Sequence, residues 1–248
     1  MKWLEFLCQR LPNALTLGNL FCGCCAVVLW LDNQPYPAAA CTIASFILDY
    51  ADGLLARALK VSSSIGRELD SLADGVSFGV VPGLMLYCLL ANALCMQEPA
   101  PTAISTAARL WCWEATPAFT LSLCAAYRLG RFNLDVNPRS YFLGLSTPAC
   151  TVWVLGLALA ASNNTFGLGD FVRRNPWTIY GLTVLLSYLM VSRIPMHGLK
   201  VEGSLRVGWQ RLLAFVVTGG LLCWGLGPLG LTVAATLYIL YSIAFPPA

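Results

Sequence analysis

Residues 49–74 read DYADGLLARALKVSSSIGRELDSLAD and decide how the rest of the chain is interpreted. Two strongly apolar segments meet here, and together they carry four aspartates: Asp49, Asp52, Asp70 and Asp74. An uncompensated carboxylate in a membrane helix costs about 2.5 to 3.5 kcal/mol on insertion scales. A cluster kept at that cost is interpreted as a functional site.

The spacing of the four aspartates allows them to meet. At about 100° per residue, each segment places its aspartates and small residues on one helical face. The two faces hold Asp49, Asp52, Gly53, Ala56 and Arg57 on the first segment, and Gly66, Asp70, Asp74 and Ser77 on the second. If residues 59–64 form the turn of an antiparallel hairpin, the two aspartates of one segment lie level with the two of the other. The sequence thus predicts a carboxylate ring, roughly one or two helical turns inside the membrane surface.

A ring of four carboxylates needs cations. Like charges so close would raise several of the pKa values unless something neutralised them. The ligands are oxygens only, with no His or Cys nearby, which favours hard divalent ions such as Mg²⁺, Mn²⁺ or Ca²⁺ over Zn²⁺.

The composition is typical of a polytopic membrane protein. Of the 248 residues, 58% are hydrophobic and 11% are charged, and the mean hydropathy is +0.69. We therefore expect one all-α integral membrane domain, residues 1–248, and no nucleic-acid partner. The 11 cysteines lie scattered in apolar runs and are interpreted as small buried hydrophobic residues.

The apolar runs predict the order of the elements. Residues 1–12 are expected to form an interfacial helix. Eight predicted spans follow at about 14–31, 37–58, 65–90, 116–129, 149–161, 177–191, 212–226 and 229–245. Residues 13–195 form the core with the first six spans, and residues 196–248 form a two-helix extension.

The basic residues predict the orientation in the membrane. Twelve of the 15 Lys and Arg residues fall at the N-terminus and in alternate connections. They are Lys2, Arg10, Arg57, Lys60, Arg67, Arg128, Arg131, Arg139, Arg193, Lys200, Arg206 and Arg211. The positive-inside rule places them in the cytoplasm, with both termini and the carboxylate ring. The membrane is expected to be a bacterial-type inner or cell membrane.

The first span carries a stripe of polar and small residues, namely Asn13, Thr16, Asn19 and Gly23. Such a face is aimed at other helices rather than at lipid. The stripe either serves helix packing alone or belongs to the site, in which case Asn19 is a candidate ligand of the substrate.

The spacing Asp49-x2-Asp52-Gly53-x2-Ala56-Arg57-x8-Gly66-x3-Asp70-x3-Asp74 resembles the signature of the CDP-alcohol phosphotransferases at every fixed position. The resemblance implies a six-helix core with a site for two metal ions at its cytoplasmic end, usually in a homodimer. It also implies an enzyme that transfers the phosphatidyl group of CDP-diacylglycerol, or another CDP-linked group, to an alcohol and releases CMP.

Within that family the chain is most similar to members that use serine. The stretches that carry this similarity are LPNALTLGNLFCG (11–23), DGVSFGVVPGL (74–84), YRLGRFN (127–133), YFLGLSTPA (141–149) and SRIPM (192–196). The implied reaction makes phosphatidylserine and CMP from CDP-diacylglycerol and L-serine among membrane lipids. A sister transferase that uses glycerol 3-phosphate, inositol phosphate or choline is the closer alternative. An ion-coupled transporter is disfavoured, because all four acids lie near one surface and no inverted repeat is visible.

The resemblance also implies roles for individual residues. Asp49, Asp52 and Asp70 would be chiefly ligands of two Mg²⁺ or Mn²⁺ ions, while Asp74 would be the catalytic base and could also touch a metal. CDP-diacylglycerol would contact Gly53, Ala56, Arg57, Gly66 and Asn19. The acceptor's carboxylate would bind Arg128 or Arg131, because a guanidinium grips a carboxylate through two parallel hydrogen bonds.

Overall fold

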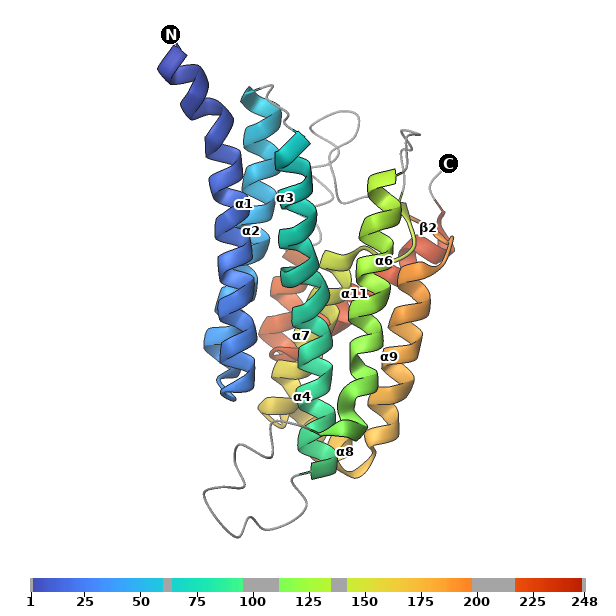
Figure 1. Cartoon of the computed structure of the whole chain (residues 1–248). Coiled ribbons are helices and arrows are strands. Elements are labelled where there is room, and N and C mark those ends of the chain that lie inside the picture. The colour runs from blue at the N-terminus through green and yellow to red at the C-terminus, as the bar shows by residue number, and fades with distance from the viewer. Residues whose placement is uncertain (1, 60–63, 96–111, 135–141, 198–216, 247–248) are drawn as a thin grey trace.

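Three long helical stretches form the N-terminal half of the bundle. The computed structural model describes residues 2–59, 64–95, 112–134, 142–197 and 217–246. Helix α1 (Lys2–Leu31) packs along α2 (Pro35–Leu59), and both lie beside a continuous stretch made of α3 (Ser64–Asp74), the π-helix η1 (Gly75–Val80) and α4 (Val81–Cys95). Figure 1 shows the start of α1, the end of α2 and the start of α3 at the same end of the bundle, called the carboxylate end below.

The second half adds shorter helices around this framework. In chain order it contains η2 (Trp113–Phe119), α6 (Thr120–Leu134), β1 (Phe142–Leu143), α7 (Thr147–Ser162), η3 (Thr165–Gly167), α8 (Leu168–Arg174), α9 (Pro176–Val191), β2 (Pro195–Met196), a helix at Val217–Leu226 and α11 (Leu229–Ala244). Strands β1 and β2 form one short antiparallel pair. Helix α7 is buried on nearly every side, as expected for a helix that is apolar all round.

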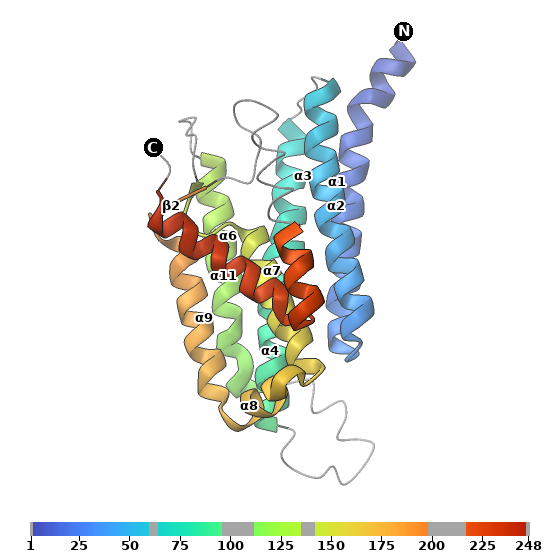
Figure 2. The same cartoon turned by 180° about the vertical axis from the view of Figure 1, so that it is seen from behind.

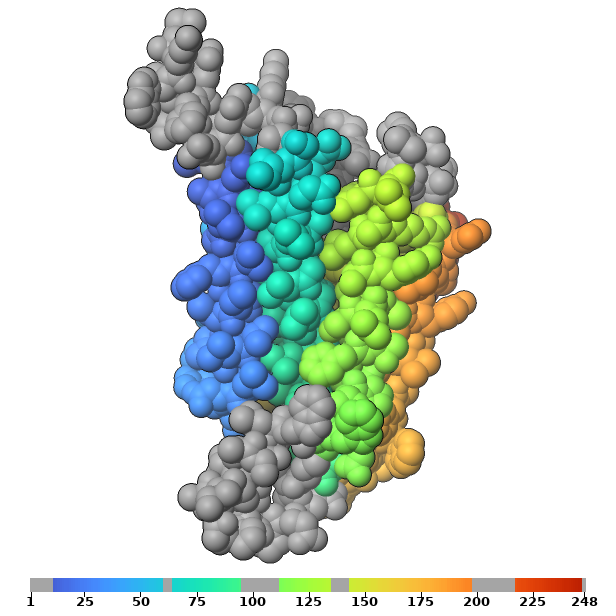
Figure 3. Space-filling model, viewed as in Figure 1, coloured from blue at the N-terminus to red at the C-terminus, as the bar shows by residue number. Residues whose placement is uncertain are grey.

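The architecture confirms the predicted all-α polytopic membrane class. Within the described residues, three helices are long and apolar enough to cross a membrane: Leu11–Leu31, Pro35–Leu59 and Ser64–Leu94. The bent pair formed by α7 and the segment Thr165–Arg174 would make a fourth. Large apolar side chains such as Phe21, Leu72 and Leu123 are exposed along the sides of these helices. Figure 3 shows this lateral face, on which α1, α3–α4, α6 and α9 lie side by side.

Several predicted element boundaries differ from those in the structure or lie outside the described residues. Residues 2–12 are the first turns of α1, which continues through Pro12 into the first predicted span. Helix α8 was not predicted; it follows α7 after a bend of 104°. The predicted turn at 60–63, the connection at 135–141 and the start of the seventh span at 212–216 lie outside the described residues, as do the side chains of 1–10.

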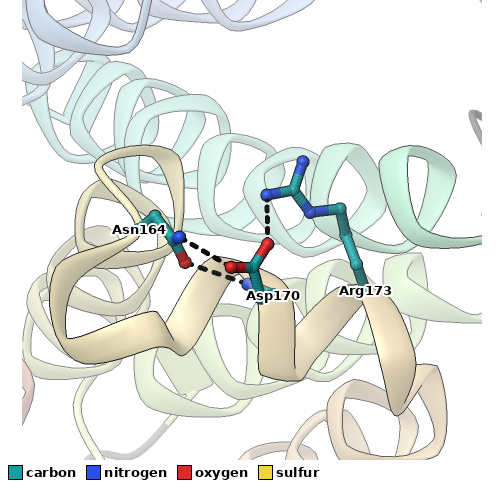
Figure 4. Close-up of polar contacts among 3 residues, drawn as sticks. All are labelled: Asn164, Asp170 and Arg173. Atoms are coloured by element: carbon teal, nitrogen blue, oxygen red, sulfur yellow. Dashed lines mark hydrogen bonds and ion pairs between the residues drawn. The ribbon is translucent and has the colours of Figure 1, made fainter.

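The bend after α7 is held by polar contacts at the opposite end of the bundle. Asn164 adopts a left-handed conformation with φ of 49°, which short polar side chains tolerate best after glycine. Its amide donates to Asp170 Oδ2 at 2.8 Å, and its carbonyl accepts from the Asp170 backbone N–H at 3.0 Å. Arg173 reaches the same carboxylate at 2.8 Å (Figure 4). These bonds close the turn that starts α8.

The π-helix η1 begins directly after Asp74, and its two final buried residues are bonded to neighbouring helices. Thr151 of α7 lies 3.3 Å from the Phe78 carbonyl, and Ser122 of α6 donates to the Gly79 carbonyl at 2.8 Å. A π-helical turn leaves carbonyls without their usual i+4 partner, so side chains of other helices can reach them. The position of Asp74 is thereby tied to both α6 and α7.

Helix α11 of the C-terminal extension is fastened to α7 by close packing and hydrogen bonds. Trp153 Nε1 donates to Thr236 Oγ1 at 2.9 Å, and Thr232 Oγ1 donates to the Trp153 carbonyl at 3.0 Å. Gly156 of α7 lies so close to α11 that a Cβ added to it would stand 2.6 Å from the Thr232 backbone nitrogen. Figure 2 shows α11 running obliquely across the bundle over α7.

Replacing Gly156 with alanine tests this packing. We expect Gly156→Ala to lower the free energy of unfolding by about 1 to 3 kcal/mol, because the new methyl group must displace backbone of α11. Gly181→Ala on α9 is the matched control, since nothing lies within 4 Å of its Cβ position. Denaturant unfolding in detergent measures both variants. Equal stability of the two would show that α7 and α11 do not pack as described.

Candidate functional site

Three of the predicted carboxylates come together at the carboxylate end. Asp49 on α2 and Asp70 and Asp74 on α3 each offer an oxygen, and these oxygens lie within 4.8 Å of one another. All three side chains are half-buried. Oxygen ligands stand about 2.0 to 2.6 Å from Mg²⁺ or Ca²⁺, so oxygens around one ion lie up to roughly 5 Å apart. The donor set and its spacing therefore fit a hard divalent cation.

The fourth carboxylate faces α1. Asp52 is buried, and its Oδ2 accepts a hydrogen bond from Thr16 Oγ1 at 2.6 Å. It remains within electrostatic range of Asp49 and Asp70. A hydrogen bond to a charged group is worth about 1.5 to 3 kcal/mol, which offsets part of the cost of burying this carboxylate. Asp52 thus borders the other three and is anchored by the first helix.

Asn19 lies about one turn after Thr16 on α1, and its side-chain amide has no hydrogen-bond partner among the described residues. The residue is fully buried, and its backbone carbonyl accepts hydrogen bonds from Ser45 Oγ at 3.1 Å and Ser77 Oγ at 3.2 Å. Neither side-chain atom has a hydrogen-bond partner among the described residues. Helical side chains tilt toward the N-terminus, which for α1 is the direction of Thr16 and the carboxylates. An orphaned buried amide costs about 1 to 3 kcal/mol, so its position suits a bound ligand.

The small residues of the signature leave room beside the carboxylates. Gly53 has nothing within 4 Å of its Cβ position, and Ala56 and Gly66 are half-buried. Arg57 is exposed, and its Nε donates to the Gly53 carbonyl at 2.9 Å. The guanidinium therefore stands at the end of α2, one to two turns beyond Asp52 at about 3.6 residues per turn.

The two arginines of α6, Arg128 and Arg131, differ in their exposure to solvent. Arg128 is half-buried, lies within electrostatic range of Asp74 and Cys150, and has an Nε without a hydrogen-bond partner among the described residues. Arg131 is exposed. Asn133 Nδ2 donates to Ser71 Oγ at 2.7 Å and so ties the end of α6 to α3. The fold thus half-buries Arg128 within electrostatic range of Asp74 and leaves Arg131 exposed.

Two residues near the site carried little signal in the sequence. Thr16 belongs to the polar stripe of the first span, but nothing in the stripe singles it out as the partner of Asp52. Tyr238 lies within electrostatic range of Arg128 although it comes from α11, far along the chain. His197 pairs through Nε2 with the Phe245 carbonyl at 2.7 Å.

A sequence model of the CDP-alcohol phosphatidyltransferase family matches residues 9–192. This range contains every aspartate of the site, Asn19 and both arginines of α6, and it ends before α11.

Three curated relatives that share one name are also similar to this chain. A protein of Helicobacter pylori named CDP-diacylglycerol–serine O-phosphatidyltransferase is 31% identical over 236 residues, which cover 94% of this chain and 89% of that protein. The Bacillus subtilis protein of the same name is 32% identical, with 78% and 93% covered. A Mycobacterium leprae protein of that name is 33% identical over 76% of this chain, which spans only 58% of its length. With its family signature intact and its carboxylates grouped in the bundle, the chain belongs to the CDP-alcohol phosphatidyltransferase family.

Proposed function

We propose that this protein transfers the phosphatidyl group of CDP-diacylglycerol to the hydroxyl of L-serine, forming phosphatidylserine and CMP. The observation that carries the proposal is the cluster of the Asp49, Asp70 and Asp74 carboxylates, with the half-buried Arg128 in electrostatic range of Asp74. Relatives named for this activity support the choice of serine as acceptor.

Two divalent ions, Mg²⁺ or Mn²⁺, are proposed to bind at the four aspartates. Asp49, Asp70 and Asp74 would hold one ion between them, and Asp52, anchored by Thr16, would complete the set for a second. When bound, such ions neutralise the pyrophosphate and the charge that develops on the leaving phosphate.

The CDP end of the donor is proposed to lie along the signature face. Gly53, Ala56 and Gly66 lack bulky side chains, so a nucleotide can approach the backbone there. Arg57 supplies a cation at the end of α2, and Asn19 supplies the buried amide whose hydrogen-bonding capacity is otherwise unused.

The acceptor is proposed to bind between Arg128 and Asp74. If the serine carboxylate pairs with the Arg128 guanidinium, the electrostatic proximity of Arg128 to Asp74 puts the serine hydroxyl near that carboxylate. Asp74 then takes the hydroxyl proton while the serine oxygen attacks the phosphorus that bears diacylglycerol. The bond from that phosphorus to the bridging oxygen breaks, and CMP leaves with the electron pair.

The carboxylate end is proposed to face the cytoplasm, in a homodimer within a bacterial-type inner or cell membrane. Besides the basic residues, Cys112 supports this orientation, because it is disulfide-bonded. Its backbone N–H donates to Tyr87 on α4, which lies roughly 20 Å beyond Asp74 along the helix axis. Disulfides persist in oxidising compartments, so that end would face away from the cytoplasm. The prediction that the cysteines are plain hydrophobic residues is wrong for Cys112.

An acceptor screen tests the proposed reaction. Purified protein with CDP-diacylglycerol and Mg²⁺ or Mn²⁺ should release CMP when L-serine is added and form phosphatidylserine, as measured by chromatography of both products. EDTA should abolish the release, and the divalent ion should restore it. Faster release with glycerol 3-phosphate, inositol phosphate or choline would assign another acceptor.

Loss of one cluster carboxylate should weaken metal binding. Outer-shell changes at metal sites typically cost about 10- to 100-fold in affinity, so Asp70→Asn should lower Mn²⁺ affinity at least about tenfold. Titration followed by electron paramagnetic resonance of free Mn²⁺ measures this without any substrate. Glu68→Gln on the exposed face of α3 is the control with the same change of charge. Equal affinities in the two variants would exclude the cluster as the metal site.

Lysine substitutions test which of the two α6 arginines, Arg128 or Arg131, binds the serine carboxylate. Lysine keeps the charge but cannot form two parallel hydrogen bonds, so the serine KM should rise about tenfold with little change in the KM for CDP-diacylglycerol. Arg131→Lys, at an exposed site on the same helix, should leave both constants unchanged. A serine KM raised only by Arg131→Lys would reverse the assignment.

A further inference from the structure

Helix α1 contacts the aspartates of the site although it lies outside the signature at residues 49–74. Thr16 Oγ1 donates a hydrogen bond to Asp52 Oδ2 at 2.6 Å, and both residues are buried. Asp52 follows Asp49 by three residues on α2, so the two share one helical face, and Asp49 belongs to the three-carboxylate cluster. The first helix therefore supplies a hydrogen-bond donor directly beside the proposed metal ligands.

The hydroxyl proton of Thr16 has two acceptors within reach. The Pro12 carbonyl on the same helix lies 3.1 Å from Oγ1, and the Asp52 carboxylate oxygen lies 2.6 Å from it. A threonine has a single O–H proton. Hydrogen bonds from a hydroxyl to a carboxylate are about 2.5 to 2.7 Å long and stronger than those to a neutral carbonyl. The proton therefore goes to Asp52, and the contact with Pro12 is the weaker of the two.

Thr16 has a fixed place because the next two turns of α1 are fastened to its neighbours. The Asn19 carbonyl accepts hydrogen bonds from Ser45 Oγ of α2 at 3.1 Å and from Ser77 Oγ of η1 at 3.2 Å. At Gly23 the two backbones approach closely, since an added Cβ would stand 3.2 Å from the Ser77 Cα. Any sliding or rotation of α1 that moved Thr16 away from Asp52 would break these contacts.

The bond from Thr16 gives the two oxygens of Asp52 different roles. Oδ2 is held by α1, so Oδ1 is the oxygen left for a metal ion. The Gly53 backbone N–H is a further hydrogen-bonding neighbour of this carboxylate, but it belongs to the same helix. Thr16 is thus the donor that fixes the carboxylate relative to a second helix. Hydrogen bonds of this kind orient the carboxylates that bind metals, and their loss typically costs about 10- to 100-fold in metal affinity.

We infer that Thr16 is a positioning residue for the second divalent ion: its hydroxyl holds Oδ2 of Asp52 so that Oδ1 is offered to that ion. The inference rests on the two-ion site of the proposed function and deepens it. It gives α1 a role in metal occupancy that the signature at residues 49–74 does not contain. The ion held between Asp49, Asp70 and Asp74 does not depend on this hydrogen bond.

Thr16→Val tests this role because it removes the hydroxyl and keeps the branched shape of the side chain. Purified protein is titrated with Mn²⁺ alone, and free Mn²⁺ is followed by electron paramagnetic resonance. The wild-type chain should bind two ions. Thr16→Val should bind one ion as the wild type does and the other about 10- to 100-fold more weakly. Thr42→Val is the matched control, because this buried threonine of α2 donates to the Ala38 carbonyl of its own helix, and it should leave both affinities unchanged.

Thr16→Ser separates positioning from a merely structural role, because it restores the hydroxyl and should restore the affinity for the second ion. Loss of both ions together in Thr16→Val, two unchanged affinities in that variant, or equal weakening in the valine and serine variants would each overturn the inference. A wild-type chain that binds fewer than two ions would overturn the two-ion site as well. Absence of serine-dependent CMP release, with the expected metal titrations intact, would overturn the proposed reaction and leave the role of Thr16 standing.

Discussion

The burial of carboxylates inside an apolar bundle is the constraint on which the rest of this structure depends. The charge of Asp52 is accommodated by a hydrogen bond from Thr16, and this bond joins α2 to α1. Asp49, Asp70 and Asp74 place three oxygens within 4.8 Å of one another, and a cation bound between them would offset the repulsion of their charges. The helix hairpin thus gathers oxygen ligands of the kind that hard divalent ions prefer.

The π-helix after Asp74 connects the carboxylates to the helices that surround Arg128. Its two carbonyls bonded by Ser122 and Thr151 hold the end of η1 against α6 and α7. The same two helices carry Arg128 and Cys150, so the turn that positions Asp74 also positions it relative to the half-buried Arg128. A regular α-helix at this point would rotate Asp74 relative to both neighbours, because a π-turn inserts one extra residue.

Part of the site could be predicted because it depends on local spacing. The period of the helix groups Asp49 with Asp52 and Asp70 with Asp74, and a short connection after Leu59 makes the two segments antiparallel. The resemblance to a family added the chemistry. Spacing could not predict that Asp52 turns to Thr16, or that Arg128 is half-buried while Arg131 is exposed, because these differences depend on helices that are distant in the chain.

The sequence by itself determined the membrane class, most of the helical segments and the carboxylate face, because hydrophobic length and helical period are properties of neighbouring residues. Only the tertiary structure decided how the helices are rotated against one another. That rotation is set by close approaches between distant segments, such as Gly23 against Ser77 and Gly156 against Thr232. It also decides where α11 docks on α7, because only a residue without a side chain leaves space for the α11 backbone at Gly156.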